Sequence, residues 1–81
     1  MKIKVKDVEG FRELIVKKGY SQRSFGRVLG ISESYVAQIA NGIRNPGPKV
    51  AKNITDVLDV DFGDIFFIES VAKANNRYLK Y

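Results

Sequence analysis

The stretch SQRSFGRVLGISESYVAQIANG (residues 21–42) decides the fold. Ser21 and Ser32 are favoured helix N-caps, and each precedes a short amphipathic run. Gly30 ends the first run, because glycine adopts the positive φ of a tight turn at little cost, and an Asn-Gly pair ends the second. The two short helices that this pattern predicts cover residues 22–29 and 33–40.

The spacing of small and aliphatic residues indicates that these two helices cross closely. Counted from Gln22, Gly26 comes four residues later, Gly30 eight, Val36 fourteen and Ile39 seventeen. Any side chain larger than a methyl group at the crossing would push the helices apart, so a glycine fits there. The side chains expected to face inward from the pair are Phe25, Val28, Leu29, Ile31, Val36 and Ile39.

The flanking sequence predicts three further helices. Asp7 caps the first, which Gly19 ends, although the internal Gly10 weakens it by about 1 kcal/mol relative to alanine and could make its first turn fray. Pro48 suits the first turn of a helix that carries a regular apolar stripe, and Asp61 caps a short last one. The apolar stripes are Val8, Phe11, Leu14 and Ile15 in the first helix, and Val50, Ala51, Ile54, Val57 and Leu58 in the fourth.

Two other segments favour β-structure. KIKVK (2–6) alternates basic and apolar residues, and FFIESV (66–71) is rich in β-forming residues. The fold class expected is therefore all-α with five helices, and a small β element from residues 2–6 and 66–71 is left open. The end of the chain, 72–81, is polar and expected to be partly disordered.

Composition narrows the possible functions. The chain has no cysteine and no histidine, which removes disulfides, thiolate metal sites and the commonest general base. We therefore expect no enzyme, no metal and no cofactor. No run approaches the length of a membrane span, and charges occupy the place of a signal peptide's apolar region, so a cytoplasmic protein without membrane contact is expected.

The charge is unevenly distributed along the chain. Residues 1–52 carry 11 lysines and arginines against 4 acidic residues, whereas residues 53–72 carry 5 acidic residues and no basic one. Three basic residues in 73–81 bring the net charge to +5. A basic part joined to an acidic one suggests one face for a polyanion and another turned away from it.

The whole of residues 8–66 resembles the Cro/cI-type (XRE family) helix-turn-helix domain of phage repressors and small bacterial regulators. The residues that carry the resemblance are 21–42, then RNP before the fourth helix, then LDVDFGDIF. It implies a lambda-repressor-like five-helix domain and a sequence-specific regulator that binds double-stranded DNA. We expect one domain over 1–81, with a core at 8–66 and a C-terminal extension at 67–81.

The third helix is expected to be the recognition helix. At about 100° per residue, its short polar side chains fall on one side and its aliphatic ones on the other. Gln38 could pair with an adenine edge, and Glu33 could either accept from cytosine or only stabilise the helix N-terminus. Ser32 could be a plain N-cap. By the resemblance Ser32, Glu33, Ser34 and Gln38 fall on base-contacting positions, and Ala37 leaves room for close approach or a thymine methyl group.

Affinity is expected to come from residues that flank this helix. Phosphate contacts position such a domain and supply most of its non-specific binding. Lys17, Lys18 and Arg27 are treated as solvated surface. The expected phosphate contacts are Gln22, which the resemblance places at a phosphate-binding helix start, with Arg23, Asn41, Arg44 and Lys49.

A homodimer is expected, because two half-sites on one face of DNA lie about 34 Å apart, beyond the span of one small domain. The apolar C-terminal residues could form the dimer contact. Alternatively, residues 2–6 and 66–71 could pair as a sheet within one chain and cover these apolar residues. Both hold if a sheet shared between two chains forms the dimer. A second hypothesis is an antitoxin or phage regulator that holds a toxin, an antirepressor or another regulator. The residues expected to dimerise are Phe62, Ile65, Phe66, Phe67 and Ile68.

Overall fold

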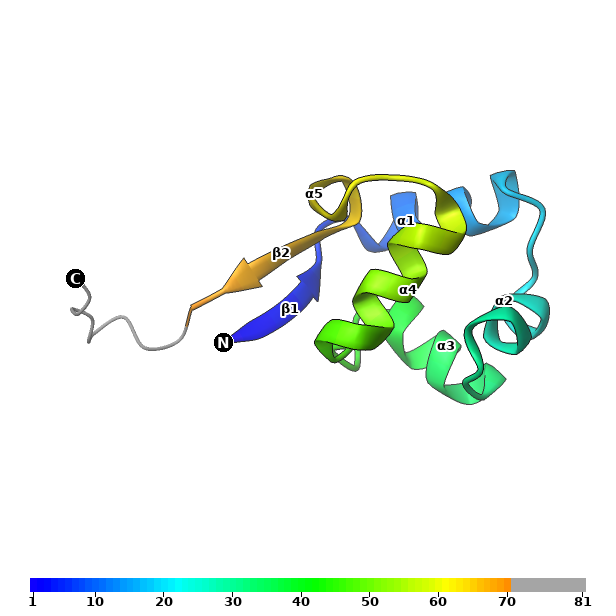
Figure 1. Ribbon diagram of the computed structural model, residues 1–81, viewed down its shortest axis with the longest axis horizontal. Helices are drawn as coiled ribbons and strands as arrows, with labels where there is room; N and C mark the ends of the chain where they lie inside the picture. Colours follow the sequence, from blue (N-terminus) through cyan, green and yellow to red (C-terminus); the bar gives the residue numbers. More distant parts are fainter. Residues whose placement is uncertain (71–81) are drawn as a thin grey trace.

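The computed structural model describes residues 1–70, in which a two-stranded ribbon extends from a body of five helices (Figure 1). The elements are β1 (Lys2–Val5), α1 (Val8–Lys17), α2 (Gln22–Leu29), α3 (Glu33–Ala40), α4 (Pro48–Leu58), α5 (Phe62–Ile65) and β2 (Phe66–Glu69). The predicted five-helix fold is confirmed, and the small β element that the sequence left open is present. Val71, the end of the second predicted strand, and the predicted disorder of 72–81 lie outside the described residues.

Side-chain caps set where the helices begin. The Asp7 carboxylate accepts from the backbone N–H of Gly10 (3.1 Å), so α1 begins at Val8 despite its internal glycine. Ser21 and Ser24 form a reciprocal capping box at the start of α2, with N···O distances of 2.9 and 3.0 Å. Gly30 then ends α2 at a φ of 77°, the left-handed conformation that the turn requires.

One apolar core joins all five helices and the first residue of β2. Its largest fully buried side chains are Phe25, Phe66, Ile39, Ile54 and Leu58. The inward orientation expected for Val28 is wrong, since this side chain is 54% exposed. Val28 lies roughly 100° around the helix from the middle of the stripe that Phe25, Gly26 and Leu29 form against the core.

The crossing of α2 and α3 leaves no room for a side chain at Gly26. A Cβ atom there would lie 2.8 Å from the carbonyl oxygen of Ile31 and 3.1 Å from Cγ2 of Val36. The first of these neighbours is backbone and cannot rotate away. The close crossing inferred from the spacing of residues 22–39 is therefore confirmed.

The ribbon ties the two ends of the described chain together. Its strands are antiparallel, with Ile3 opposite Ile68 and Val5 opposite Phe66. Lys4 forms an ion pair with Glu69 (3.2 Å) beside this pairing. Pairing of the N-terminal and C-terminal segments as a sheet, one of the alternatives predicted from the sequence, is thus present for residues 2–5 and 66–69.

Pairing of the strands uses only part of the apolar C-terminal surface. Ile65 and Phe66 are buried in the chain's own core, where the Phe66 ring packs against that of Phe62 at a centroid distance of 5.3 Å. Phe67 and Ile68 remain 44% and 54% exposed. Of the five residues expected to dimerise, these two offer the most surface to another molecule.

The tight crossing at Gly26 can be tested by adding a single methyl group. Gly26→Ala should lower the free energy of unfolding by up to about 2 kcal/mol, because the overpacking cost of about 1–3 kcal/mol is offset by only roughly 1 kcal/mol of gained helix propensity. Gly63→Ala in α5 is the matched control, since a Cβ there would meet nothing within 4 Å. Urea unfolding followed by circular dichroism measures both, and equal stability of the two variants would contradict a tight crossing.

Candidate nucleic-acid interface

Helix α3 lies along the lower side of the domain in Figure 1. One side of it carries polar residues that are exposed or half-buried. Val36, Ile39 and Ala40 anchor its other side in the core. All five residues predicted to contact bases lie outside that core. Ser32, Glu33 and Ser34 are exposed, and Ala37 and Gln38 are half-buried.

Ser32 acts as the N-cap of α3. Its hydroxyl oxygen accepts from the backbone N–H of Tyr35 at 3.0 Å. The cap uses one lone pair, so the hydroxyl hydrogen remains free to donate. Capping and base contact are therefore compatible at this residue.

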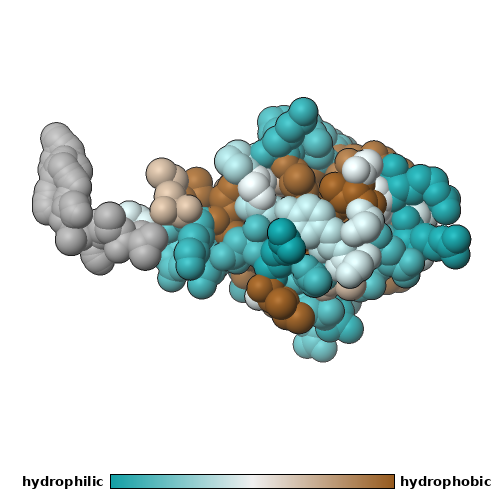
Figure 2. Space-filling view, turned by 90° about the horizontal axis from the view of Figure 1, so that it is seen from below, coloured by the Kyte–Doolittle hydropathy of each residue, from teal (hydrophilic) through white to brown (hydrophobic). Residues whose placement is uncertain are grey.

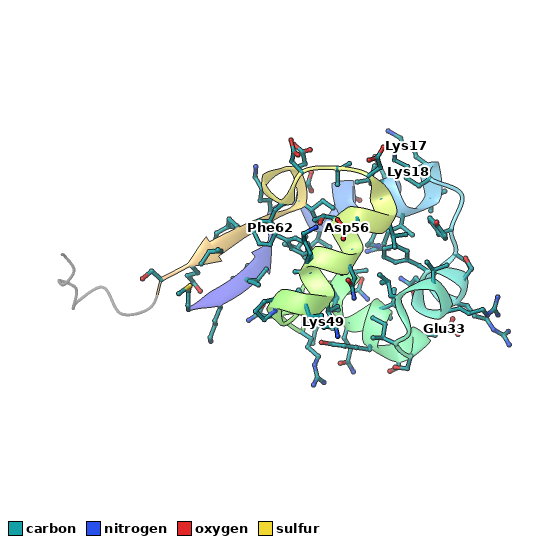
Figure 3. All side chains as sticks on the ribbon, viewed as in Figure 1. Lys17, Lys18, Glu33, Lys49, Asp56 and Phe62 are labelled. Atoms are coloured by element: carbon teal, nitrogen blue, oxygen red, sulfur yellow. The ribbon has the colours of Figure 1, made fainter. Side chains whose placement is uncertain are left out.

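Four of the predicted phosphate contacts lie at helix ends around α3. Gln22 and Arg23 form the first turn of α2, Asn41 is the C-cap of α3, and Lys49 stands in the first turn of α4. In Figure 3, Lys49 and Glu33 both lie on the lower side of the domain, whereas Lys17 and Lys18 lie at its top. That position agrees with treating Lys17 and Lys18, at the C-terminal end of α1, as solvated surface.

Arg12 lies close to these residues, although no role was predicted for it. Its guanidinium, on α1, donates to the side-chain oxygen of Asn41 (3.2 Å), and it lines a surface groove together with Gln22. Glu9 and Glu13 line the same groove and reduce its positive charge. In the sequence, Arg12 is marked only by its place on the polar side of α1. Its closeness to Asn41 depends on the packing of α1 against α3, which the sequence does not show.

Arg44 differs from the other predicted phosphate contacts because it lies against α3. Its guanidinium carbon is 4.9 Å from the centre of the Tyr35 ring, and a guanidinium N–H donates to Oε1 of Gln38 in a long hydrogen bond of 3.5 Å. Arg44 is thus held beside a residue predicted to contact bases.

The surface changes in character along the domain. Figure 2, seen from below, shows mostly hydrophilic residues at the end that carries α2 and a hydrophobic area over the strands. No helix in residues 1–70 is long and apolar enough to span a membrane. Nor do the side chains of this part of the chain gather three or more metal-binding residues.

Helix α3 is short, has a polar outer face and is held by α2 across a close crossing at a glycine. Basic and amide groups flank it. This arrangement is that of a DNA-binding helix-turn-helix. The helix-turn-helix family model matches residues 11–65, more than half of the chain. The chain belongs to this family, among the XRE-type transcriptional regulators, and the resemblance inferred from residues 8–66 is confirmed.

Two similar proteins agree with this assignment. The chain is 34% identical over 58 residues to an uncharacterized HTH-type transcriptional regulator, YazB, of Bacillus subtilis (strain 168), a match that covers 72% of this chain and 80% of the relative. The crystal structure of the restriction-modification controller protein C.AhdI from Aeromonas hydrophila matches with a TM-score of 0.63 and 28% identity. That match covers 70% of this chain and 83% of the controller protein.

The capping role of Ser32 gives a test of stability. Ser32→Ala should lower the free energy of unfolding by about 1 kcal/mol, because the N–H of Tyr35 loses its partner. Ser32→Asp should keep most of the stability, since a carboxylate accepts the same bond and favours a helix N-terminus. Ser34→Ala is the control, an exposed serine with no side-chain hydrogen bond within residues 1–70. If urea unfolding gave both alanine variants the same stability, the cap would contribute nothing.

Proposed function

We propose that the protein is a sequence-specific DNA-binding regulator that occupies an operator and excludes polymerase or another regulator. The observation that supports this most strongly is the outer face of α3, where five short or polar side chains stand outside the core over two turns of helix. A helix of this kind fits the major groove with its N-terminal residues nearest the base edges. Such a regulator acts in the cytoplasm, and we assign it no catalytic activity.

In this proposal the base contacts come from α3. Ser34 and Gln38 face outward without a core role and contact base edges by hydrogen bonds. Ala37 gives the backbone close access or meets a thymine methyl group. Glu33 accepts from a cytosine amino group or serves only the helix N-terminus, and Ser32 contacts a base in addition to its cap.

Phosphate contacts supply the affinity. Gln22 and Arg23 contact the DNA phosphates on one side of α3, and Asn41 and Lys49 contact them on the other. All four residues stand at helix ends that flank the outer face of α3. Arg12 adds a positive charge beside Asn41. Asp56, from the acidic part of the chain, lies above Lys49 in Figure 3 and forms an ion pair with Lys52 (2.7 Å).

The operator is bound by a homodimer in this proposal. Phe67 and Ile68 expose apolar surface on β2, and in a two-stranded ribbon each strand leaves one edge unpaired. Phe62, Ile65 and Phe66 support the contact from within their own chain, because they are buried or half-buried there. A second copy would cover the exposed pair and place a second α3 for the other half-site.

Selection from a random duplex pool tests the function. The wild-type protein should enrich one palindromic sequence, and Gln38→Ala should relax preference at one base pair at a cost of about 1–3 kcal/mol. Lys49→Ala, the contrasting variant, should weaken binding to all sequences alike. The slope of the logarithm of the binding constant against the logarithm of the salt concentration should become less steep by about one, the contribution of one phosphate contact. Binding that ignores sequence and disappears with salt would contradict a regulator and indicate a DNA-coating protein.

The dimer contact has its own test. Ile68→Glu should shift the protein toward the monomer in sedimentation equilibrium, because it puts a charge into the proposed apolar contact. Val16→Glu is the matched control, since Val16 is 71% exposed on α1, away from the strands. If the wild type is a monomer at micromolar concentration, or if both variants dissociate equally, this interface is wrong.

A protein partner is the second candidate, favoured by the same exposed pair, Phe67 and Ile68. An antitoxin or phage regulator would bury these residues against a toxin, an antirepressor or another regulator instead of a second copy. A small toxin reading frame next to the gene, and a stable complex of the two products, would favour this candidate over the homodimer.

A further inference from the structure

We propose that Arg44 contacts a base, and that with Gln38 it forms one reading unit that selects guanine. This inference rests on the proposed function, since it concerns how the same DNA site is recognised. It departs from the expectation that Arg44 binds phosphate. Three contacts between Arg44 and α3 carry it.

The first contact fixes the backbone of Arg44. Its N–H and that of Ile43 both donate to the carbonyl oxygen of Gln38, at 3.2 and 2.9 Å. This carbonyl belongs to the last turn of α3, where the helix itself no longer supplies a partner. The start of the Arg44 side chain is thus held at a fixed place at the C-terminal end of the recognition helix.

The other two contacts orient the exposed side chain of Arg44 toward α3. The guanidinium carbon lies 4.9 Å from the centre of the Tyr35 ring, and an N–H reaches Oε1 of Gln38 at 3.5 Å. Tyr35 and Gln38 are three residues apart, so their side chains are neighbours on one surface of α3. Arg44 consequently lies along the helix instead of extending freely into solvent, and less side-chain freedom is lost on binding.

The held guanidinium keeps its charge and most of its donors available. Stacking on a ring uses the flat face of the group, whereas its N–H donors point outward in the plane. The ion pairs found in residues 1–70 are Lys4 with Glu69 and Lys52 with Asp56, so none involves Arg44. An arginine held in this way can still make a two-pronged contact.

The pattern of donors points to guanine. A glutamine alone pairs with adenine by donating to N7 and accepting from the amino group, which needs its Oε1. Oε1 of Gln38 accepts from Arg44 with one of its two lone pairs, and the free N–H groups of Arg44 lie beside the amide N–H groups of Gln38, so donors outnumber acceptors in this unit. Guanine, with acceptors at O6 and N7, is the base whose major-groove edge matches such a pair of donors.

A charge-preserving substitution separates base reading from phosphate binding. Affinity should be measured for the selected duplex and for versions in which each guanine is replaced by adenine. The wild type should discriminate roughly 5- to 150-fold at one guanine per half-site, the range of a good two-pronged contact. Arg44→Lys keeps the positive charge but loses the planar fork, so this ratio should fall to near one while the salt dependence stays the same.

Two further variants complete the test. Arg23→Lys, the same substitution at a proposed phosphate contact, should leave the guanine ratio unchanged whatever it does to the absolute affinity. Tyr35→Leu should reduce the ratio at the same guanine by removing the ring that holds Arg44, whereas Tyr35→Phe should retain it. Melting curves of all variants confirm that they fold.

The outcomes distinguish this inference from the function on which it rests. If Arg44→Lys keeps the wild-type ratio at every guanine, Arg44 does not contact a base, although a wild type that selects a sequence would still be a specific regulator. If the wild type selects no sequence at all, the proposed function itself fails.

Discussion

The contact at Gly26 is the constraint on which the rest of the molecule depends. With the carbonyl oxygen of Ile31 only 2.8 Å from where a side chain would begin, α2 and α3 meet with backbone almost against backbone. This closeness lets two helices of eight residues each share one core with α4, although neither is long enough to be stable alone. Because α3 is held from beneath in this way, its N-terminal residues Ser32, Glu33 and Ser34 stay exposed.

The sequence predicted those parts of the fold that depend on local chemistry. Serine and aspartate caps, the glycine turn and the apolar stripe of α4 each follow from neighbouring residues, so the helices occur where they were expected. The prediction that Val28 faces inward was wrong because the buried stripe of an eight-residue helix is narrow. A side chain next to that stripe is already exposed to solvent. The ribbon could only be left open, since pairing Val5 with Phe66 depends on contacts remote in sequence.

The candidate site was predictable to a similar depth. Polar residues on the outer side of α3 follow from helical periodicity, so it could be predicted that these five residues lie outside the core. The neighbours of those residues were not predictable in this way. Arg12 reaches Asn41 across 29 positions of sequence, and the place of Arg44 depends on how the chain turns back after α3 toward Tyr35. Side-chain partners formed by tertiary packing leave no periodic trace in a single sequence.

The position of Phe66 has a consequence for how the chain acquires its fold. This residue closes the core against Phe11, at a ring distance of 6.0 Å, yet it lies 55 residues further along the chain. During synthesis, α1 to α4 can emerge and begin to associate while one wall of their core still faces water. During synthesis β2 is therefore the last described element that can join, and its pairing with β1 is a long-range closure that is slower than helix formation. Until that step, the apolar side of α1 that Phe66 covers through Phe11 is open to other chains.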